Sequence, residues 1–150
     1  MVDEKRGNLI DRTLYIPRMS YGGARSFAAA FRHLGVDAHL SPEGDERTYE
    51  LAGRHTSGDE CLPERVTIGN FLKVTEAPGF KPEGTAFFMP TAGGPCRFGQ
   101  YSPFLRHVLD NLGYEDIMIV SPTSWERAVA AWPMPMLLIS LRASSCPSVR

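Results

Sequence analysis

Hydrophobic and polar positions follow two different spacings along the chain, and each spacing predicts a different element. Short apolar runs at Leu14–Ile16, Thr85–Met89 and Ile117–Val120 predict buried strands. Between residues 36 and 40 apolar and polar side chains alternate, which predicts a strand with one buried face. The sequence therefore contains four expected strands, separated by segments in which apolar residues recur at helical spacing.

The first two helices are expected on either side of the alternating strand. From Ser20 onwards apolar residues follow helical spacing, and Gly35 supplies the stop. After the strand, a short helix is predicted over Asp45–Ala52, with Gly53 ending it. A glycine is thus expected to end each of these helices.

Two longer helices are expected in the second half of the chain. One begins just after Cys61, with Pro63 in its first turn, and runs towards Lys73. The other has Ser102 as its N-cap, a proline in its first position, and Gly113 as its stop. A further short helical piece is expected near Trp125.

Strands that alternate with helices predict a three-layer α/β sandwich with a mainly parallel sheet, comparable to half of a Rossmann or flavodoxin-like domain. We expect a flexible N-terminal segment over residues 1–12, the α/β lobe over residues 13–127, and an atypical, poorly ordered tail over residues 128–150. In such folds ligands bind at the carboxyl ends of strands, where the loops 17–23 and 90–99 are expected.

Composition narrows the class of protein. The chain has 150 residues, 43% of them hydrophobic, and a formal net charge of −1, which argues against nucleic acid as a partner. No apolar stretch approaches the roughly 20 residues that span a membrane. The N-terminal residues are charged and polar and lack the apolar core of a signal peptide. We therefore expect a cytoplasmic protein that does not enter the membrane.

The three cysteines are Cys61, Cys96 and Cys146. In such a protein a disulfide framework is not expected, so each thiol is either a small buried hydrophobic group or a metal-binding or redox group. The absence of a CxxC pair disfavours a zinc knuckle and a thioredoxin-type dithiol. A thiol switch between Cys61 and Cys96 would need Cα atoms within about 7 Å of one another.

Cys96 lies in a glycine-rich loop between a predicted strand and a predicted helix. The amides of Gly93 and Gly94 can point at an anion or at sulfide, and Arg97 beside a helix start favours a thiolate. Cys61 lies at a second loop-to-helix junction, where Asp59 and neighbouring acidic residues oppose a free thiolate unless a cation is bound. For both cysteines, a structural role in a packed turn is the alternative.

Other candidates carry weaker signals. The segment Arg18–Gly23 could cradle a phosphate or carboxylate at a helix N-terminus, but an ordinary strand-to-helix turn explains it better. His55 is expected to be a solvated loop residue, and His107 falls on the polar side of its helix, where no role is assigned.

Several of these segments together resemble a known family. The motif SGDECLP around Cys61, the motif GPCRFGQY around Cys96, and the segments YIPRMS and VSPTS are similar to the large CoA-enzyme activases of anaerobes. These proteins belong with the 2-hydroxyacyl-CoA dehydratase system. The resemblance covers roughly Leu14 to Ser124 and points to the dehydratase-like region of such proteins, without their ATPase domains.

The resemblance implies iron–sulfur chemistry and electron transfer. It assigns Cys61 and Cys96 as metal ligands of a [4Fe–4S] cluster, with Gly93, Gly94 and Arg97 donating hydrogen bonds to sulfide or to the ligand sulfurs. It implies ATPase activase domains or dehydratase subunits as partners. The isolated chain is then not expected to be an enzyme by itself.

Two features depart from the family. A [4Fe–4S] cluster normally has three or four thiolate ligands, and the resembling region has only two. Cys146 could be a third, but its surroundings are unlike the family, as is the chain from about Ala128 onwards. We therefore expect an incomplete ligand set in a truncated or frame-shifted piece of a longer protein. The alternative is a non-catalytic α/β interaction lobe with structural cysteines.

Overall fold

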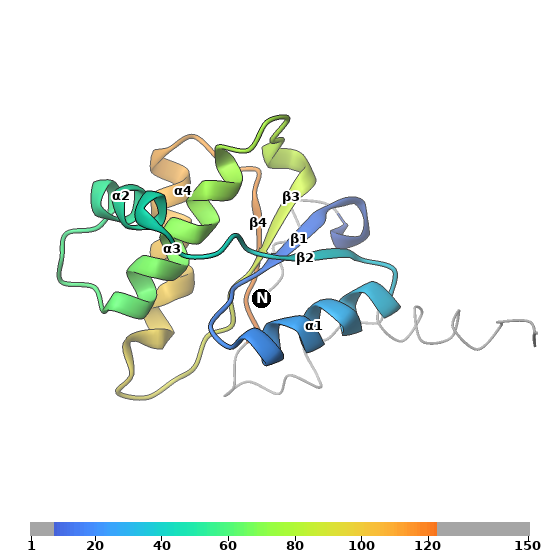
Figure 1. Cartoon of the computed structure of the whole chain (residues 1–150), viewed down its shortest axis with the longest axis horizontal. Coiled ribbons are helices and arrows are strands. Elements are labelled where there is room, and N and C mark those ends of the chain that lie inside the picture. Colours follow the sequence, from blue (N-terminus) through green and yellow to red (C-terminus); the bar gives the residue numbers. More distant parts are fainter. Residues whose placement is uncertain (1–7, 123–150) are drawn as a thin grey trace, which may run out of the picture.

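The computed structural model describes residues 8–122, which form a parallel sheet with helices on both faces (Figure 1). The strands are β1 (Thr13–Ile16), β2 (Asp37–Leu40), β3 (Thr85–Phe88) and β4 (Met118–Val120). They lie in the order β2-β1-β3-β4, and every neighbouring pair is parallel. The predicted three-layer α/β sandwich is confirmed.

The helices α1 (Tyr21–His33), α2 (Glu46–His55), α3 (Leu62–Thr75) and α4 (Tyr101–Asn111) connect these strands. The shorter 3-10 turns are η2 (Leu9–Asp11), η3 (Pro82–Gly84) and η4 (Arg97–Gln100). Helix α1 covers one face of the sheet, whereas α2, α3 and α4 gather on the other (Figure 1).

Side chains of β3 point alternately into two separate cores. Ala86 and Phe88 pack with residues of α1, whereas Phe87 and Met89 pack with residues of α3 and α4. All four are 4% exposed or less, because helices cover both faces of this central strand. The continuous apolar run in the sequence is the consequence of this double burial.

Helices α2 and α3 cross at close range. A Cβ atom built on Gly69 of α3 would lie 2.2 Å from the backbone carbonyl oxygen of Thr48 in α2. Only glycine therefore fits at this crossing. On its other side α3 packs on the sheet, where the ring of Phe71 stacks on that of Phe87 with the ring centroids 4.4 Å apart.

The predicted end of the second helix is wrong. Helix α2 continues through Gly53 to His55, and Gly53 has no positive φ. Leu51 and Ala52, directly before it, are buried against the core, and this packing outweighs the roughly 1 kcal/mol that a glycine costs inside a helix. The left-handed residue of this region is Gly58, with a φ of +99°.

The predicted N-cap of the last helix is also wrong. Turn η4 leads directly into α4, so Gln100 already has helical backbone angles and Ser102 lies inside the first turn. Pro103 remains compatible with this position, because first-turn amides have no partner within the helix.

The start of the described chain is tied to the sheet by Arg12, which is 8% exposed. Its Nη1 atom donates hydrogen bonds to the backbone oxygens of Thr85, at 3.0 Å, and Asp116, at 2.8 Å. No helix within residues 8–122 has both the length and the apolar character needed to cross a membrane. The expected tail over residues 128–150 and the helical piece near Trp125 lie outside the described residues.

Candidate functional site

Both cysteine loops lie at the carboxyl edge of the parallel sheet. Cys61 is the N-cap of α3, and Cys96 precedes η4, which leads into α4. Helices that connect parallel strands run back against the strand direction, so their N-termini lie at the carboxyl ends of the strands. The two loops also touch, because Nη1 of Arg97 donates a hydrogen bond to the backbone oxygen of Asp59.

The sulfur of Cys61 has two polar neighbours. The hydroxyl oxygen of Tyr101, the first residue of α4, lies 2.9 Å from Sγ. On the other side, Sγ lies 4.0 Å from Oε2 of Glu64, one turn further along α3. Cys61 is half-buried and Tyr101 is 5% exposed, so this contact is largely shielded from solvent.

The electrostatics of Tyr101 connect it with both cysteines. Burial raises the pKa of Tyr101, and the hydrogen bond with Cys61 and the negative charges of Cys61, Glu64 and Cys96 raise it further. Both thiols therefore lie close enough to influence one phenol.

Glu64 is a carboxyl group with almost no access to solvent. It is 2% exposed, and its pKa is raised by burial and by the charge of Glu60, while the guanidinium of Arg97 opposes that rise. It borders a hollow of about 160 Å³ between the two loops. The hollow is lined by Asp59, Glu60, Glu64, Arg97, Gln100 and Phe104.

The tip of the Cys96 loop is open to solvent. Cys96 is exposed, as are Gly93 and Gly94. Gly94 has a φ of +116°, which favours glycine, and no other group lies within 4 Å of a Cβ built at either glycine. The loop tip is therefore not packed against other groups at these two glycines.

The base of the same loop is closed. The hydroxyl of Thr91 donates to the backbone oxygen of Gly99 at 3.2 Å. A Cβ atom on Gly99 would lie 2.7 Å from the backbone oxygen of Ala92, so the two ends of the loop approach at a distance that excludes a side chain. The loop therefore has a pinned base and an open tip that carries Cys96.

The thiols of Cys61 and Cys96 are not joined by a disulfide. Within residues 8–122, no three His, Cys, Asp or Glu side chains are grouped as ligands for a metal ion. Two thiols on touching loops fit part of the ligand set of a [4Fe–4S] cluster, which needs one or two further thiolates. Those further ligands would have to come from outside the described residues.

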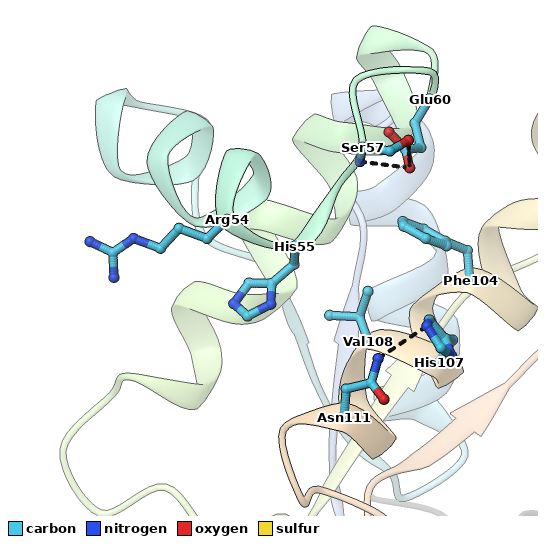
Figure 2. A pocket seen from close by; sticks show the side chains of 8 residues that line it. All are labelled: Arg54, His55, Ser57, Glu60, Phe104, His107, Val108 and Asn111. Carbon is cyan, nitrogen blue, oxygen red and sulfur yellow. Dashed lines mark hydrogen bonds between the residues drawn. The ribbon is translucent and has the colours of Figure 1, made fainter.

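A second, larger hollow lies between the end of α2 and the side of α4. It measures about 420 Å³, and Figure 2 shows His55 and His107 on its two sides. The residues that line it are Arg54, His55, Ser57, Glu60, Phe104, His107, Val108 and Asn111. Glu60 and Phe104 line both hollows, so the two are neighbours.

The sequence did not predict that these two histidines share a hollow. His55 is the last residue of α2 instead of a loop residue, and it is half-buried. His107 is exposed, and its Nε2 accepts a hydrogen bond from Nδ2 of Asn111 at 3.0 Å (Figure 2). No local pattern could have paired them, because their proximity depends on how α2 packs beside α4.

The segment Arg18–Gly23 has the contacts of an ordinary strand-to-helix turn. The Ser20 side chain accepts a hydrogen bond from the backbone N–H of Gly23, as an N-cap does. The guanidinium of Arg18 is engaged by the backbone oxygen of Ser41 and by Oε1 of Glu43, each at 2.7 Å. Its charge is therefore already paired.

Comparison of the chain with protein-family models, curated protein sequences and solved structures finds no significant match. The geometry of the two cysteine loops and the motifs that surround them are therefore the features that point to a function. Of the residues assigned from sequence, Cys61, Cys96 and Arg97 all lie at the one edge where these loops meet.

Proposed function

We propose that this α/β lobe contributes Cys61 and Cys96 as thiolate ligands to a [4Fe–4S] cluster, as part of a cytoplasmic electron-transfer system for the activation of 2-hydroxyacyl-CoA dehydratases. One observation carries the proposal. Two thiols from loops far apart in the sequence lie at the same sheet edge, where Arg97 of one loop donates a hydrogen bond to the backbone oxygen of Asp59 in the other. A cluster, when bound, supplies one-electron transfer at low potential.

The surroundings of Cys96 support a ligand role. An exposed thiol contributes little to packing, so burial does not account for a cysteine at this position. Arg97 supplies a positive charge next to it, and the exposed glycines Gly93 and Gly94 leave space in which a ligand could approach the backbone. The charge of Arg97 would offset the negative charge of thiolates and sulfide.

The remaining ligands would come from a partner. ATPase activase domains or dehydratase subunits could supply the missing thiolates at the carboxyl edge of the sheet, where both described thiols lie. Within such an assembly the described lobe would hold one side of the cluster. By itself the chain would carry no complete catalytic site.

A second candidate function is an interaction lobe with structural cysteines. It is favoured by the contact between Cys61 and Tyr101, because a half-buried thiol with a hydrogen-bond partner needs no metal. This candidate predicts that the purified protein holds no iron and that replacing Cys61 costs stability without any loss of a bound group.

The test is anaerobic reconstitution of the full chain with iron and sulfide, followed by determination of iron and acid-labile sulfide per chain. The proposal expects bound iron that falls when either Cys61 or Cys96 is replaced by serine. Iron content in both variants equal to that of the unsubstituted chain would refute it. Reconstitution should also be carried out beside a purified dehydratase subunit, since a partner would supply further ligands.

A further inference from the structure

The hydroxyl of Tyr101 and the sulfur of Cys61 form a hydrogen bond, with Oη and Sγ 2.9 Å apart, in which either atom can be the donor while Cys61 is a thiol. Sγ also lies 4.0 Å from Oε2 of Glu64, which can accept the thiol hydrogen. When Cys61 is a thiolate, as a cluster ligand is, it has no hydrogen to donate, so Tyr101 is then the donor.

Tyr101 is held in place independently of the sulfur. Its ring packs edge-on against Phe98 with the centroids 5.2 Å apart, and it belongs to the core cluster beneath α3 and α4. It is 5% exposed and stands at the first position of α4. The hydroxyl is therefore directed at Sγ by packing, and little rotational freedom is lost when the bond forms.

We propose that Tyr101 is the positioning residue of Cys61: its O–H group fixes the orientation of the sulfur and withdraws electron density from it. A hydrogen bond to a ligand sulfur stabilises the more reduced state of an attached iron–sulfur centre. Tyr101 would then raise the reduction potential of a cluster held by Cys61. This last consequence rests on the proposed function, whereas the positioning of the thiol does not.

The chain offers a matched control in Tyr114. This tyrosine is also partly buried and packs edge-on against an aromatic ring, that of Phe80, with the centroids 5.4 Å apart. It lies beyond the opposite end of α4 from Tyr101. Tyr101→Phe and Tyr114→Phe each remove one hydroxyl and keep the ring, but only the first removes a partner of Cys61.

The first experiment is Raman spectroscopy of the S–H stretch in the full chain without a cluster. Cys96→Ser and Cys146→Ser are introduced so that Cys61 is the only thiol. We expect Tyr101→Phe to shift this band and Tyr114→Phe to leave it unchanged. An unchanged band in Tyr101→Phe would overturn the proposal, whatever the outcome with iron.

The second experiment compares the midpoint potential of the reconstituted chain with that of its two tyrosine variants. We expect Tyr101→Phe to shift the potential to a more negative value and Tyr114→Phe to leave it unchanged. Equal potentials in the unsubstituted chain and Tyr101→Phe would overturn the proposal. If no cluster forms but the S–H band moves, the proposed function fails, while the positioning role of Tyr101 is supported.

Discussion

Arg97, in the loop that carries Cys96, donates a hydrogen bond to the backbone carbonyl of Asp59, in the loop that carries Cys61. The bond joins two loops that are distant in the sequence and adjacent at the carboxyl edge of the sheet. Arg97 is exposed, so the bond adds little to the stability of the fold. The bond instead connects the two cysteine loops to each other.

Replacing Arg97 should weaken the connection between the two cysteine loops while leaving the stability of the fold almost unchanged. In Arg97→Gln we expect the free energy of unfolding to change by less than about 0.5 kcal/mol, as for other exposed positions. Iron bound after reconstitution should nevertheless fall, because the loops lose a connection and a positive charge. Arg25→Gln, an exposed arginine on α1, is the control and should retain its iron. Equal iron in the two variants would contradict this role.

The buried carboxyl of Glu64 should make stability depend on pH. Its pKa is raised in the folded state, so the folded protein binds a proton more tightly than the unfolded chain does. Ionisation of Glu64 therefore destabilises the folded protein. This destabilisation is absent below the ordinary glutamate pKa of about 4.5 and grows as the pH rises through the pKa that Glu64 has in the folded protein. Glu64→Gln should therefore gain stability relative to the parent chain as the pH is raised.

Urea unfolding of Glu64→Gln and the parent chain between pH 4 and pH 7 measures this difference. Glu83→Gln, at an exposed position in η3, is the control and should show no such trend. A constant difference between Glu64→Gln and the parent across this range would show that Glu64 does not carry the expected penalty.

Two glycines of the packed helices α2 and α3 should respond differently to an added methyl group: Gly53 should accept it and Gly69 should not. Gly69→Ala would place a Cβ atom against the backbone oxygen of Thr48, and we expect it to destabilise the protein by about 1–3 kcal/mol. Gly53→Ala meets its nearest atom, Nη2 of Arg65, at 3.9 Å and should stabilise α2 by about 0.5–1 kcal/mol. Thermal unfolding of the two variants provides the comparison.

A destabilised Gly53→Ala protein would mean that α2 ends at this glycine, as the sequence pattern had indicated. A Gly69→Ala protein as stable as the parent would mean that α2 and α3 are further apart than the structure has them.

The two described thiols should differ in their access to reagents. Cys96 is exposed, whereas Cys61 is half-buried beside Tyr101 and Glu64. With the native, iron-free chain, iodoacetamide should modify Cys96 before Cys61. Mass spectrometry of the tryptic peptides identifies each site, and denatured protein gives the reference rates. Faster modification of Cys61 would contradict the placement of its side chain.

Much of the fold follows from local sequence patterns. All four strands were predicted to within a residue or so, because each combines an apolar run or alternation with a nearby proline, glycine or polar turn. The errors arose where tertiary packing overrides local preference. Gly53 lies within a helix because its neighbours pack on the core, and Ser102 is not a cap because η4 already supplies a helical entry.

The candidate site was only partly predictable. The motifs point to Cys61 and Cys96, whereas the sequence indicates no role for Tyr101 beyond its place in the motif around Cys96. The role of Tyr101 depends on its contact with Cys61, which joins the starts of α3 and α4, and no local sequence spacing predicts such a contact. Burial of Glu64 is similarly a consequence of how α3 packs against α4, and the sequence alone presents it as one more acidic residue.

Ligation of a cluster by Cys61 and Cys96 is tested by the EPR spectrum of the dithionite-reduced, anaerobically reconstituted chain, recorded beside Cys61→Ser, Cys96→Ser and Arg25→Gln. We expect a reduced iron–sulfur signal in the parent and in Arg25→Gln, and its loss or marked weakening in both serine variants. An identical signal in all four proteins, or no signal in the parent even with a dehydratase subunit present, would show that these cysteines do not hold a cluster.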